Sequence, residues 1–282
     1  MPLCKIGIIQ YINSIFFWGP LVLKKIIPPF EVVLDTPAAL NRKMMSGELQ
    51  ASMVSSATYL QNQNSLQLVS PFGISAKSHV LSVALFSPEP VDTLVDAPIA
   101  ITEESATSVK LLEVLAKKYW GLNVHMQVVK KPTEHPIYLL IGDACLTHKT
   151  PTNYYKIDLA QQWHLFTGLP FTFGVFVEKT PIREWKEVMQ EAYLYSQKHM
   201  GIIVDLAATK INLSKQEIEA YLNCLEFELR EEHVESMRLF KEWSAEVSSG
   251  RLKDEQDNFL SREFSNVQGN ALKYKSLGHR PR

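Results

Sequence analysis

Ile101-Thr102-Glu103-Glu104-Ser105-Ala106-Thr107-Ser108 is a hydroxyl-rich turn that follows one apolar run, residues 97–101, and precedes a segment of helical pattern, residues 105–119. In that segment the residues of one face recur at steps of three and four, and Gly121 stands where the helix would end. A strand followed by a helix directs the first backbone N–H groups of the helix, at the positive end of its dipole, toward the turn. The stretch predicts an α/β unit with a seat for a carboxylate or phosphate, although Ser and Thr at such a position more often form an ordinary helix N-cap.

Composition and charge limit the class of protein. The chain has 282 residues, of which 46% are apolar, so it is long enough for roughly two domains of about 150 residues with buried cores. Its 29 Lys and Arg residues are balanced by 30 Asp and Glu residues. Proteins that bind nucleic acids carry a basic surface. We therefore expect neither DNA nor RNA as a partner.

The cysteines and the apolar N-terminus bear on the compartment. Cys4, Cys145 and Cys224 are odd in number, far apart and set among apolar residues, which is typical of buried free thiols in a reducing compartment. Residues 1–23 are apolar, but polar residues interrupt them and no signal-peptide cleavage site follows. No run reaches the roughly 18 apolar residues of a membrane span. We expect a cytoplasmic protein without a membrane partner.

Strand and helix patterns alternate along most of the chain. We expect strands at residues 3–9, 30–34, 51–54 and within 80–86, and a helix at 37–45 ended by Gly47. A second unit has strands expected at 97–101, 125–129 and 137–141, a helix at 159–166 and a strand at 171–177. From residue 181 onward we expect helices only, over 181–206 and 214–247, with a polar tail and one short helix in 250–282.

This order predicts an α/β protein of two lobes. We expect the chain to cross out of the first lobe near Ser87 and to return near Phe171. Residues 1–87 and 176–282 would then form the first lobe, and residues 88–175 the second. In such folds ligands bind at the carboxyl ends of strands, in the cleft between the lobes. The charged runs Glu226-Phe227-Glu228 and Arg230-Glu231-Glu232 are interpreted as the solvated face of the last helix.

The short motifs of several enzyme classes are absent from the sequence. There is no GxGxxG or GxxxxGK[ST] loop for a nucleotide, no HExxH pair for zinc and no GxSxG elbow for an acyl-transfer serine. The cysteines and the eight histidines do not have zinc-ligand spacing. We expect neither a cofactor nor a metal.

Polar residues at strand ends are the candidate site residues. Asn13 ends the first strand, where its amide can donate and accept hydrogen bonds, although a loop asparagine forming an Asx-turn explains it equally well. Ser55 and Ser56 follow the third strand and offer hydroxyls at a helix N-terminus, where an N-cap is the commoner role.

Three further candidates flank later strands. His79 and Ser82 stand at the start of the long apolar run, and a lone histidine there is more often structural than catalytic. Asp143 follows the strand at 137–141 and is the carboxylate best placed for acid–base work, although Gly142-Asp143 also fits a turn and helix N-cap.

Several short segments occur in the order and spacing of one family. They are residues 7–13 with Tyr11-Ile12-Asn13, 37–47, Val54-Ser55-Ser56, 73–87, 102–115 with Ser105-Ala106-Thr107-Ser108, Leu139-Leu140-Ile141-Gly142-Asp143, and 167–171. From residue 5 to about 177 the chain resembles the chorismate dehydratases of the futalosine route to menaquinone. The resemblance implies the type 2 periplasmic-binding-protein fold. The chain departs from the family pattern where Ser14-Ile15-Phe16 replaces a Thr with a nearby Pro, and where His79 replaces a common Gly.

The resemblance also implies a reaction: loss of water from chorismate to give 3-[(1-carboxyvinyl)oxy]benzoate. It implies Asn13 as the central catalytic amide. The helix start at Ser105, Ala106, Thr107 and Ser108 and the Ser55-Ser56 turn would hold the substrate carboxylates, with His79, Ser82 and Asp143 also at the site. The general base stays open, and one hypothesis is that a substrate carboxylate removes the proton.

Two other functions fit the same fold. The chain could be a small-molecule binding protein without catalysis, although such proteins usually carry a signal peptide or a lipid-anchor cysteine. It could also be a dehydratase for another cyclic diacid, an alternative that His79 and the altered neighbourhood of Asn13 keep open.

Overall fold

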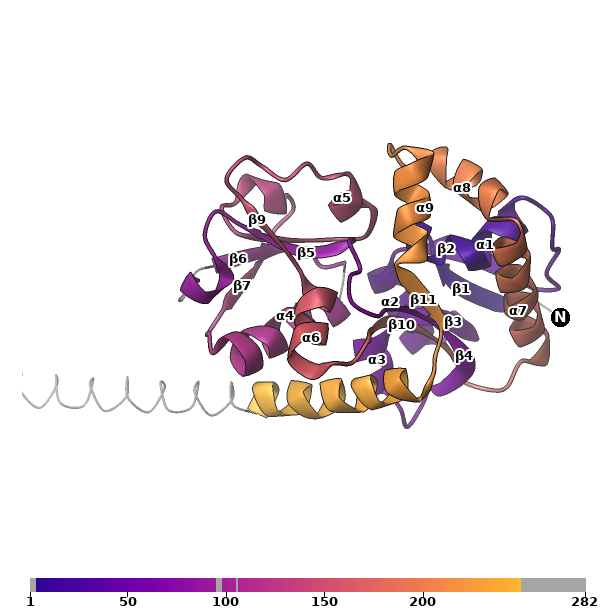
Figure 1. Cartoon of the computed structure of the whole chain (residues 1–282). Helices are drawn as coiled ribbons and strands as arrows, with labels where there is room; N and C mark the ends of the chain where they lie inside the picture. Colours follow the sequence, from indigo (N-terminus) through magenta and orange to yellow (C-terminus); the bar gives the residue numbers. More distant parts are fainter. Residues whose placement is uncertain (1–3, 95–97, 105, 250–282) are drawn as a thin grey trace, which may run out of the picture.

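The computed structural model describes residues 4–94, 98–104 and 106–249 and contains two β-sheets. The tail expected at residues 250–282 lies outside the described residues. Figure 1 shows the two sheets in separate lobes, with helices packed around each. The first lobe is the one built on the first sheet, and the second lobe is the one built on the second sheet. The α/β class and the two-lobed architecture expected from the sequence are confirmed.

The first sheet has six strands in the order β11-β4-β10-β3-β1-β2. Strands β1, β2 and β3 are parallel, whereas β10 runs antiparallel to β3 and β4, and β11 runs antiparallel to β4. Their bounds are β1 Lys5–Ile9, β2 Glu31–Asp35, β3 Ala51–Ser55, β4 Gln67–Ala76, β10 Phe171–Glu178 and β11 Leu225–Glu228.

The second sheet has five strands in the order β7-β6-β8-β5-β9. Strand β6 is parallel to β7 and β8, and β5 is antiparallel to β8 and β9. Their bounds are β5 Val83–Ser87, β6 Pro98–Ile101, β7 His125–Val128, β8 Tyr138–Ile141 and β9 Tyr155–Asp158.

The position of β5 corrects the expected crossing between the lobes. Residues 83–87 were assigned to the first lobe, but Ala84 pairs with Leu140 and Asp158 of the second sheet. The chain therefore crosses between Ala76 and Val83, and it returns to the first sheet at Phe171, as expected, so that residues 171–175 also change lobe. A strand buried on both faces shows no alternation along the sequence, so its pattern cannot tell which sheet it joins.

Helices cover both sheets. Their bounds are α1 Ile15–Val22, α2 Pro37–Ser46, α3 Ser56–Gln61, α4 Ala106–Leu115, α5 Gly142–Thr147, α6 Leu159–Thr167, α7 Arg183–Lys198, α8 Met200–Ala208 and α9 Lys215–Asn223, and residues 231–249 are also helical. Helix α4 continues into a π-helical turn, Ala116–Trp120. Gly47 and Gly121 end their helices at φ +83° and +69°, conformations that favour glycine.

The C-terminal part of the fold contains a strand where only helices were expected. Strand β11 interrupts the expected 214–247 helix, and Phe227 is buried, stacked on Phe16 at 4.6 Å between ring centroids. The run Glu226-Phe227-Glu228 is therefore not a solvated helix face. Polar residues on both sides of one aromatic match the alternation of an edge strand as well as they match a helix surface, and packing against α1 decides between them.

The helix of residues 231–249 runs beneath both lobes, under α3 and α6 (Figure 1). On the side of the second lobe, the Trp243 ring packs on the Trp163 ring of α6 at 5.5 Å. On the side of the first lobe, Lys241 Nζ donates to Gln63 Oε1 at 2.5 Å. The helix therefore connects the two lobes at the face away from α5 and α9.

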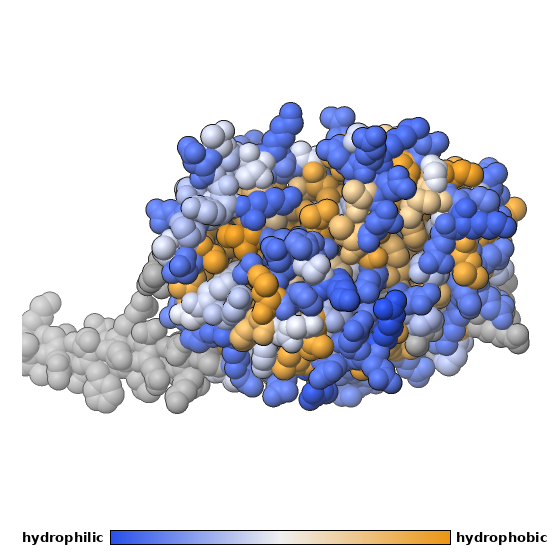
Figure 2. Space-filling model, in the orientation of Figure 1, coloured by the Kyte–Doolittle hydropathy of each residue, from blue (hydrophilic) through white to orange (hydrophobic). Residues whose placement is uncertain are grey.

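Hydrophilic side chains cover most of the face shown in Figure 2, with hydrophobic ones in scattered patches. Large exposed apolar side chains such as Ile27 and Leu165 come from different elements. Within the described ranges, no helix is long and apolar enough to span a membrane.

Candidate functional site

A pocket lies where strand ends of the two sheets face each other. It encloses about 520 Å³ of space free of protein atoms, its open mouth included. Apolar side chains form most of its wall, from β1, β4, β5, β8 and β10. Four residues expected at the site line it: Asn13, Ser55, Ser82 and Ser108. Folding thus brings together residues that are up to 95 positions apart in the chain.

Asn13 lies in the middle of a 3-10 turn, Ile12–Ser14, that follows β1. The turn is held from within the first lobe, because Ser14 Oγ donates to the Ile9 carbonyl and Trp18 Nε1 donates to the Tyr11 carbonyl at 3.2 Å. The Oδ1 atom of Asn13 is buried and has no hydrogen-bond partner among the described residues. A buried polar atom without a partner is rare in folded proteins and costs about 1–3 kcal/mol. Its place in the pocket wall indicates that a ligand supplies the missing partner.

The three pocket serines are each fixed by the protein. Ser55 is the N-cap of α3, with its Oγ accepting from the backbone N–H of Thr58 at 3.3 Å and from Asn41 Nδ2 at 3.1 Å. Ser82 Oγ accepts from the Tyr221 hydroxyl of α9 at 3.0 Å. Ser108 is buried in the first turns of α4. Ser55 thus has the N-cap role expected from the sequence and also lines the pocket, where an anion seat was expected.

Ser56 and Thr107 do not line the pocket but join the two lobes beside it. Ser56 Oγ donates to the Thr172 carbonyl at 2.7 Å, and Thr107 Oγ1 accepts from the backbone N–H of Ala57 at 3.0 Å. The two hydroxyls are 3.3 Å apart. These contacts hold the start of α3 against the start of α4, so the hydroxyls that looked like substrate ligands in sequence are occupied by the protein itself.

His79 and Ala106 are exposed and lie outside the pocket wall. The His79 ring is within hydrogen-bonding distance of Ser78 Oγ and Gln161 Nε2, both at 3.0 Å. A contact between His79 and the ligand therefore stays a prediction, with the residue placed outside the pocket wall. Ser105, the remaining residue of the expected anion seat, lies outside the described residues.

Asp143 is at the second position of α5, and its carboxylate faces the other lobe. Its Oδ1 accepts from the backbone N–H of Ile12 at 3.2 Å. It does not cap its own helix, since the N-cap residue is Ile141 and no side chain caps there. Burial raises the pKa of Asp143 to about 6, and the hydrogen bond from Ile12 opposes this rise. Asp143 is not part of the pocket wall.

Tyr11 and Gly142 stand in the quoted motifs but were not assigned as site residues, and they form a contact between the lobes. The Tyr11 hydroxyl donates to Glu104 Oε2 at 3.0 Å, and burial is the main cause that raises the pKa of the phenol. Gly142 has φ +58°, and a Cβ atom added there would be 2.9 Å from Cδ2 and Cε2 of the Tyr11 ring. The backbone of α5 can approach Tyr11 only because residue 142 lacks a side chain.

Gly142→Ala should therefore impair closure of the lobes in addition to straining the backbone. The positive φ alone costs about 1–2 kcal/mol for an L-residue. Gly168→Ala is the matched control, because Gly168 has φ +74° and nothing lies within 4 Å of an added Cβ. We expect both variants to lose similar unfolding free energy in chemical denaturation, but only Gly142→Ala to show a larger radius of gyration in X-ray scattering with ligand present. Equal radii would contradict this assignment.

Among the described residues that line the pocket, none carries a formal charge. An anion there would be held by hydroxyls and by backbone N–H groups at the start of α4. With no cation beside it, a carboxylate in this apolar pocket keeps or gains basicity, because burial raises its pKa.

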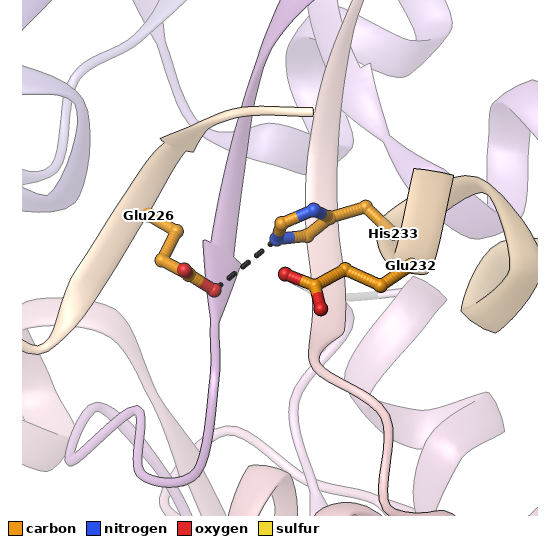
Figure 3. Close-up of side chains that lie close together, drawn as sticks. All are labelled: Glu226, Glu232 and His233. Atoms are coloured by element: carbon orange, nitrogen blue, oxygen red, sulfur yellow. Dashed lines mark hydrogen bonds and ion pairs between the residues drawn. The ribbon is translucent and has the colours of Figure 1, made fainter. Parts of the chain in front are cut away.

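One group of side chains in the described part of the chain brings three metal-type ligands together: Glu226, Glu232 and His233 (Figure 3). The buried His233 ring accepts the backbone N–H of Arg230 at Nδ1, at 3.1 Å, and its Nε2 lies 3.2 Å from Glu226 Oε2. Since Nδ1 accepts, the single proton of a neutral imidazole is on Nε2 and points at Glu226. A metal would need the lone pair of Nε2, so these contacts fit a hydrogen-bonded pair that ties β11 to the last helix.

Comparison with known proteins gives matches over most of the chain. A family model described as menaquinone biosynthesis matches residues 4–246. A chorismate dehydratase from Thermus thermophilus is 29% identical over 238 residues, which are 76% of this chain and 86% of that protein.

Solved structures match the fold. A protein from Archaeoglobus fulgidus superposes with a TM-score of 0.66 at 13% identity, covering 88% of this chain and 97% of the other. The periplasmic aliphatic sulphonate binding protein from Escherichia coli superposes with a TM-score of 0.58 at 13% identity, covering 88% and 87%. At these identities the likeness shows a shared periplasmic-binding-protein-like fold and nothing about the ligand.

Proposed function

The chain belongs to the menaquinone-biosynthesis family, and on that premise we propose that it removes water from chorismate to give 3-[(1-carboxyvinyl)oxy]benzoate. The relative from T. thermophilus carries the name of this activity. The observation that carries the proposal is the pocket between the lobes, where the amide oxygen of Asn13 is buried without a partner.

Asn13 fits the leaving group of this reaction. Chorismate has two carboxylates and one ring hydroxyl, so at neutral pH the hydroxyl is its only O–H donor. The amide oxygen of Asn13 is an acceptor in need of a donor. Asn13 therefore holds the ring hydroxyl in place, on the carbon next to the one that loses its proton.

A carboxylate of the substrate itself serves as the base in this proposal. It takes the proton from the ring carbon that bears the enolpyruvyl ether, and the ring gains a double bond and becomes aromatic. The neighbouring hydroxyl leaves with that proton as water, which regenerates the carboxylate. The uncharged pocket supports this role, because no lysine or arginine among its described lining residues would neutralise the carboxylate. The protein's contribution is orientation of the reacting groups and electrostatic stabilisation.

The second carboxylate lies at the hydroxyl-lined side of the pocket. Ser55 caps α3 and Ser108 is in the first turns of α4, so hydroxyls from both lobes converge there beside the N-terminus of α4. Binding one anion from two lobes favours the closed arrangement. A cytoplasmic location is part of the proposal, supported by the free thiols of Cys4, Cys145 and Cys224.

The proposal is tested by incubating the purified protein with chorismate. We expect an aromatic ultraviolet spectrum to appear together with loss of one water from the substrate by mass spectrometry. Binding of chorismate in calorimetry without turnover would instead favour a binding protein of this fold. Neither binding nor turnover would favour a different cyclic diacid as the substrate.

A further inference from the structure

The hydrogen bond between Asp143 and Ile12 crosses from one lobe to the other. Ile12 opens the 3-10 turn that carries Asn13 and follows β1 of the first sheet, whereas Asp143 stands on α5, directly after β8 of the second sheet. The donor is the backbone N–H of Ile12 and the acceptor is Asp143 Oδ1, 3.2 Å away. The residue next to the donor is the proposed catalytic amide.

We propose that Asp143 is a positioning residue, whose carboxylate on the second lobe holds the Ile12–Ser14 turn so that Asn13 reaches its working orientation only when the lobes are closed. This inference deepens the proposed function and rests on it. It assigns to Asp143 a role through Asn13, not a contact with the substrate.

The contacts of the turn support this role. The first N–H groups of a helical turn have no partner within the turn. Tyr11, the residue that precedes the Ile12–Ser14 turn, supplies no side-chain cap. In the first lobe, Ser14 Oγ and Trp18 Nε1 both donate to the Tyr11 carbonyl, which belongs to the same peptide unit as the Ile12 N–H. Asp143 of the second lobe holds the N–H side. The peptide unit that leads into the turn is therefore held on both sides only while the lobes are together.

Two other contacts from the second lobe reach the same place. Glu104 accepts from the Tyr11 hydroxyl, and the backbone at Gly142 packs against the Tyr11 ring. Asp143 differs from them because it bonds to the backbone of the turn itself. A helix-stabilising role alone, from an acidic residue in the first turn of α5, would not require its carboxylate to face the first lobe.

The experiment compares Asp143→Ala with Asp143→Asn and uses Thr147→Ala as the control on the same helix. Asparagine keeps an acceptor oxygen for Ile12, whereas alanine removes it. Thr147 Oγ1 donates to the Asp143 carbonyl within α5 and is exposed, so its loss perturbs the helix without touching the turn.

Two readouts are measured on the full chain: hydrogen exchange of the Ile12 amide by NMR, in the free protein and with excess product, and kcat with chorismate. For Asp143→Ala we expect Ile12 to exchange about tenfold faster or more and kcat to fall roughly 10- to 100-fold. Asp143→Asn should keep the protection and lose only a few-fold in kcat. Thr147→Ala should match the wild type in both.

A pH profile separates positioning from a merely structural role. Ionised Asp143 is the stronger acceptor, so as the pH falls through about 6, where its carboxyl becomes protonated, kcat of the wild type should decline. The titratable groups facing it, the phenols of Tyr11 and Tyr221, do not ionise in this range because burial raises the pKa of both. Asp143→Asn should lack this decline.

Three outcomes would overturn the inference: Asp143→Ala with wild-type kcat, Asp143→Asn as impaired as Asp143→Ala, or an unchanged Ile12 exchange rate in Asp143→Ala. Failure of the proposed function is distinguishable, because a wild type inactive on chorismate would still show whether Ile12 is protected by Asp143.

Discussion

Asn13→Asp should abolish most dehydratase activity, with kcat reduced at least about 100-fold. The substitution keeps the size of the side chain but places a carboxyl at a buried site that also receives a dianionic substrate. The buried carboxylate would repel the dianionic substrate, and the same repulsion together with burial would raise its pKa. The measurement is the initial rate of aromatic product formation from chorismate at saturating and subsaturating concentrations.

Asn123→Asp is the control for the chemical change alone. Asn123 is exposed, and its side-chain oxygen accepts from Lys117 Nζ at 2.9 Å. It does not line the pocket. Asn123→Asp should unfold at a denaturant concentration close to that of the wild type, and Asn13→Asp at a somewhat lower one, because a buried carboxyl with a raised pKa destabilises the folded state at neutral pH. An Asn13→Asp protein that kept wild-type kcat would remove Asn13 from the centre of the proposed mechanism.

Asp158→Ala should lower the unfolding free energy by roughly 3 kcal/mol or more, the largest stability effect that we expect at a single side chain. The buried carboxylate caps α6 through the backbone N–H groups of Ala160 and Gln161, and it also accepts from Val80 and Leu81 in the crossing segment. Removing it leaves these four donors without their acceptor. Chemical denaturation measures the loss.

Asp158→Asn should lose an intermediate amount of unfolding free energy. The size of the loss shows which carboxylate oxygen contributes more to stability. The asparagine oxygen can still cap α6, but its NH₂ group would face the N–H groups of Val80 and Leu81, which Oδ2 accepts from in the wild type. Asp205→Ala, which removes one exposed ion pair with Lys215, should change stability by less than about 0.5 kcal/mol. Asp158→Ala as stable as Asp205→Ala would contradict this account.

Asp158 also shapes the pocket, because Leu81 adopts φ +60° between two residues of the pocket wall, Val80 and Ser82. A non-glycine residue in this conformation is strained and persists only where its surroundings hold it. The two bonds from Asp158 are such a restraint. The crossing segment between the sheets is thus fixed by a residue that was not among the candidates chosen from the sequence.

The family, the α/β class and the two-lobed fold were predictable from the sequence. The family model and the sheet topology confirm them. Alternation of apolar runs with helical periodicity needs only local information, and glycines at 47 and 121 mark helix ends for a local reason, their positive φ. Strand β11 was missed because four residues of alternating polarity carry too little pattern beside two long helical segments.

The site was predictable in part. Asn13, Ser55, Ser82 and Ser108 meet at one pocket because strands carry their following residues to a common cleft. Ser56 looked no different from Ser55 in sequence, yet its hydroxyl is bonded to β10.

The sequence by itself determined the fold class, the family and which polar residues follow strands, because these depend on local periodicity and on motifs along the chain. Only the tertiary structure decided which hydroxyls face the pocket, that His79 lies outside its wall, and that Asp143 bonds to the turn of Asn13. The physical reason is that a hydrogen bond between residues 131 positions apart exists only after both sheets have formed and the lobes have met. Residues 101–108 follow the same division. The strand before them and the helix after them can be predicted from local pattern, whereas Ser108 reaches the pocket and Thr107 reaches the neighbouring helix α3 only through packing.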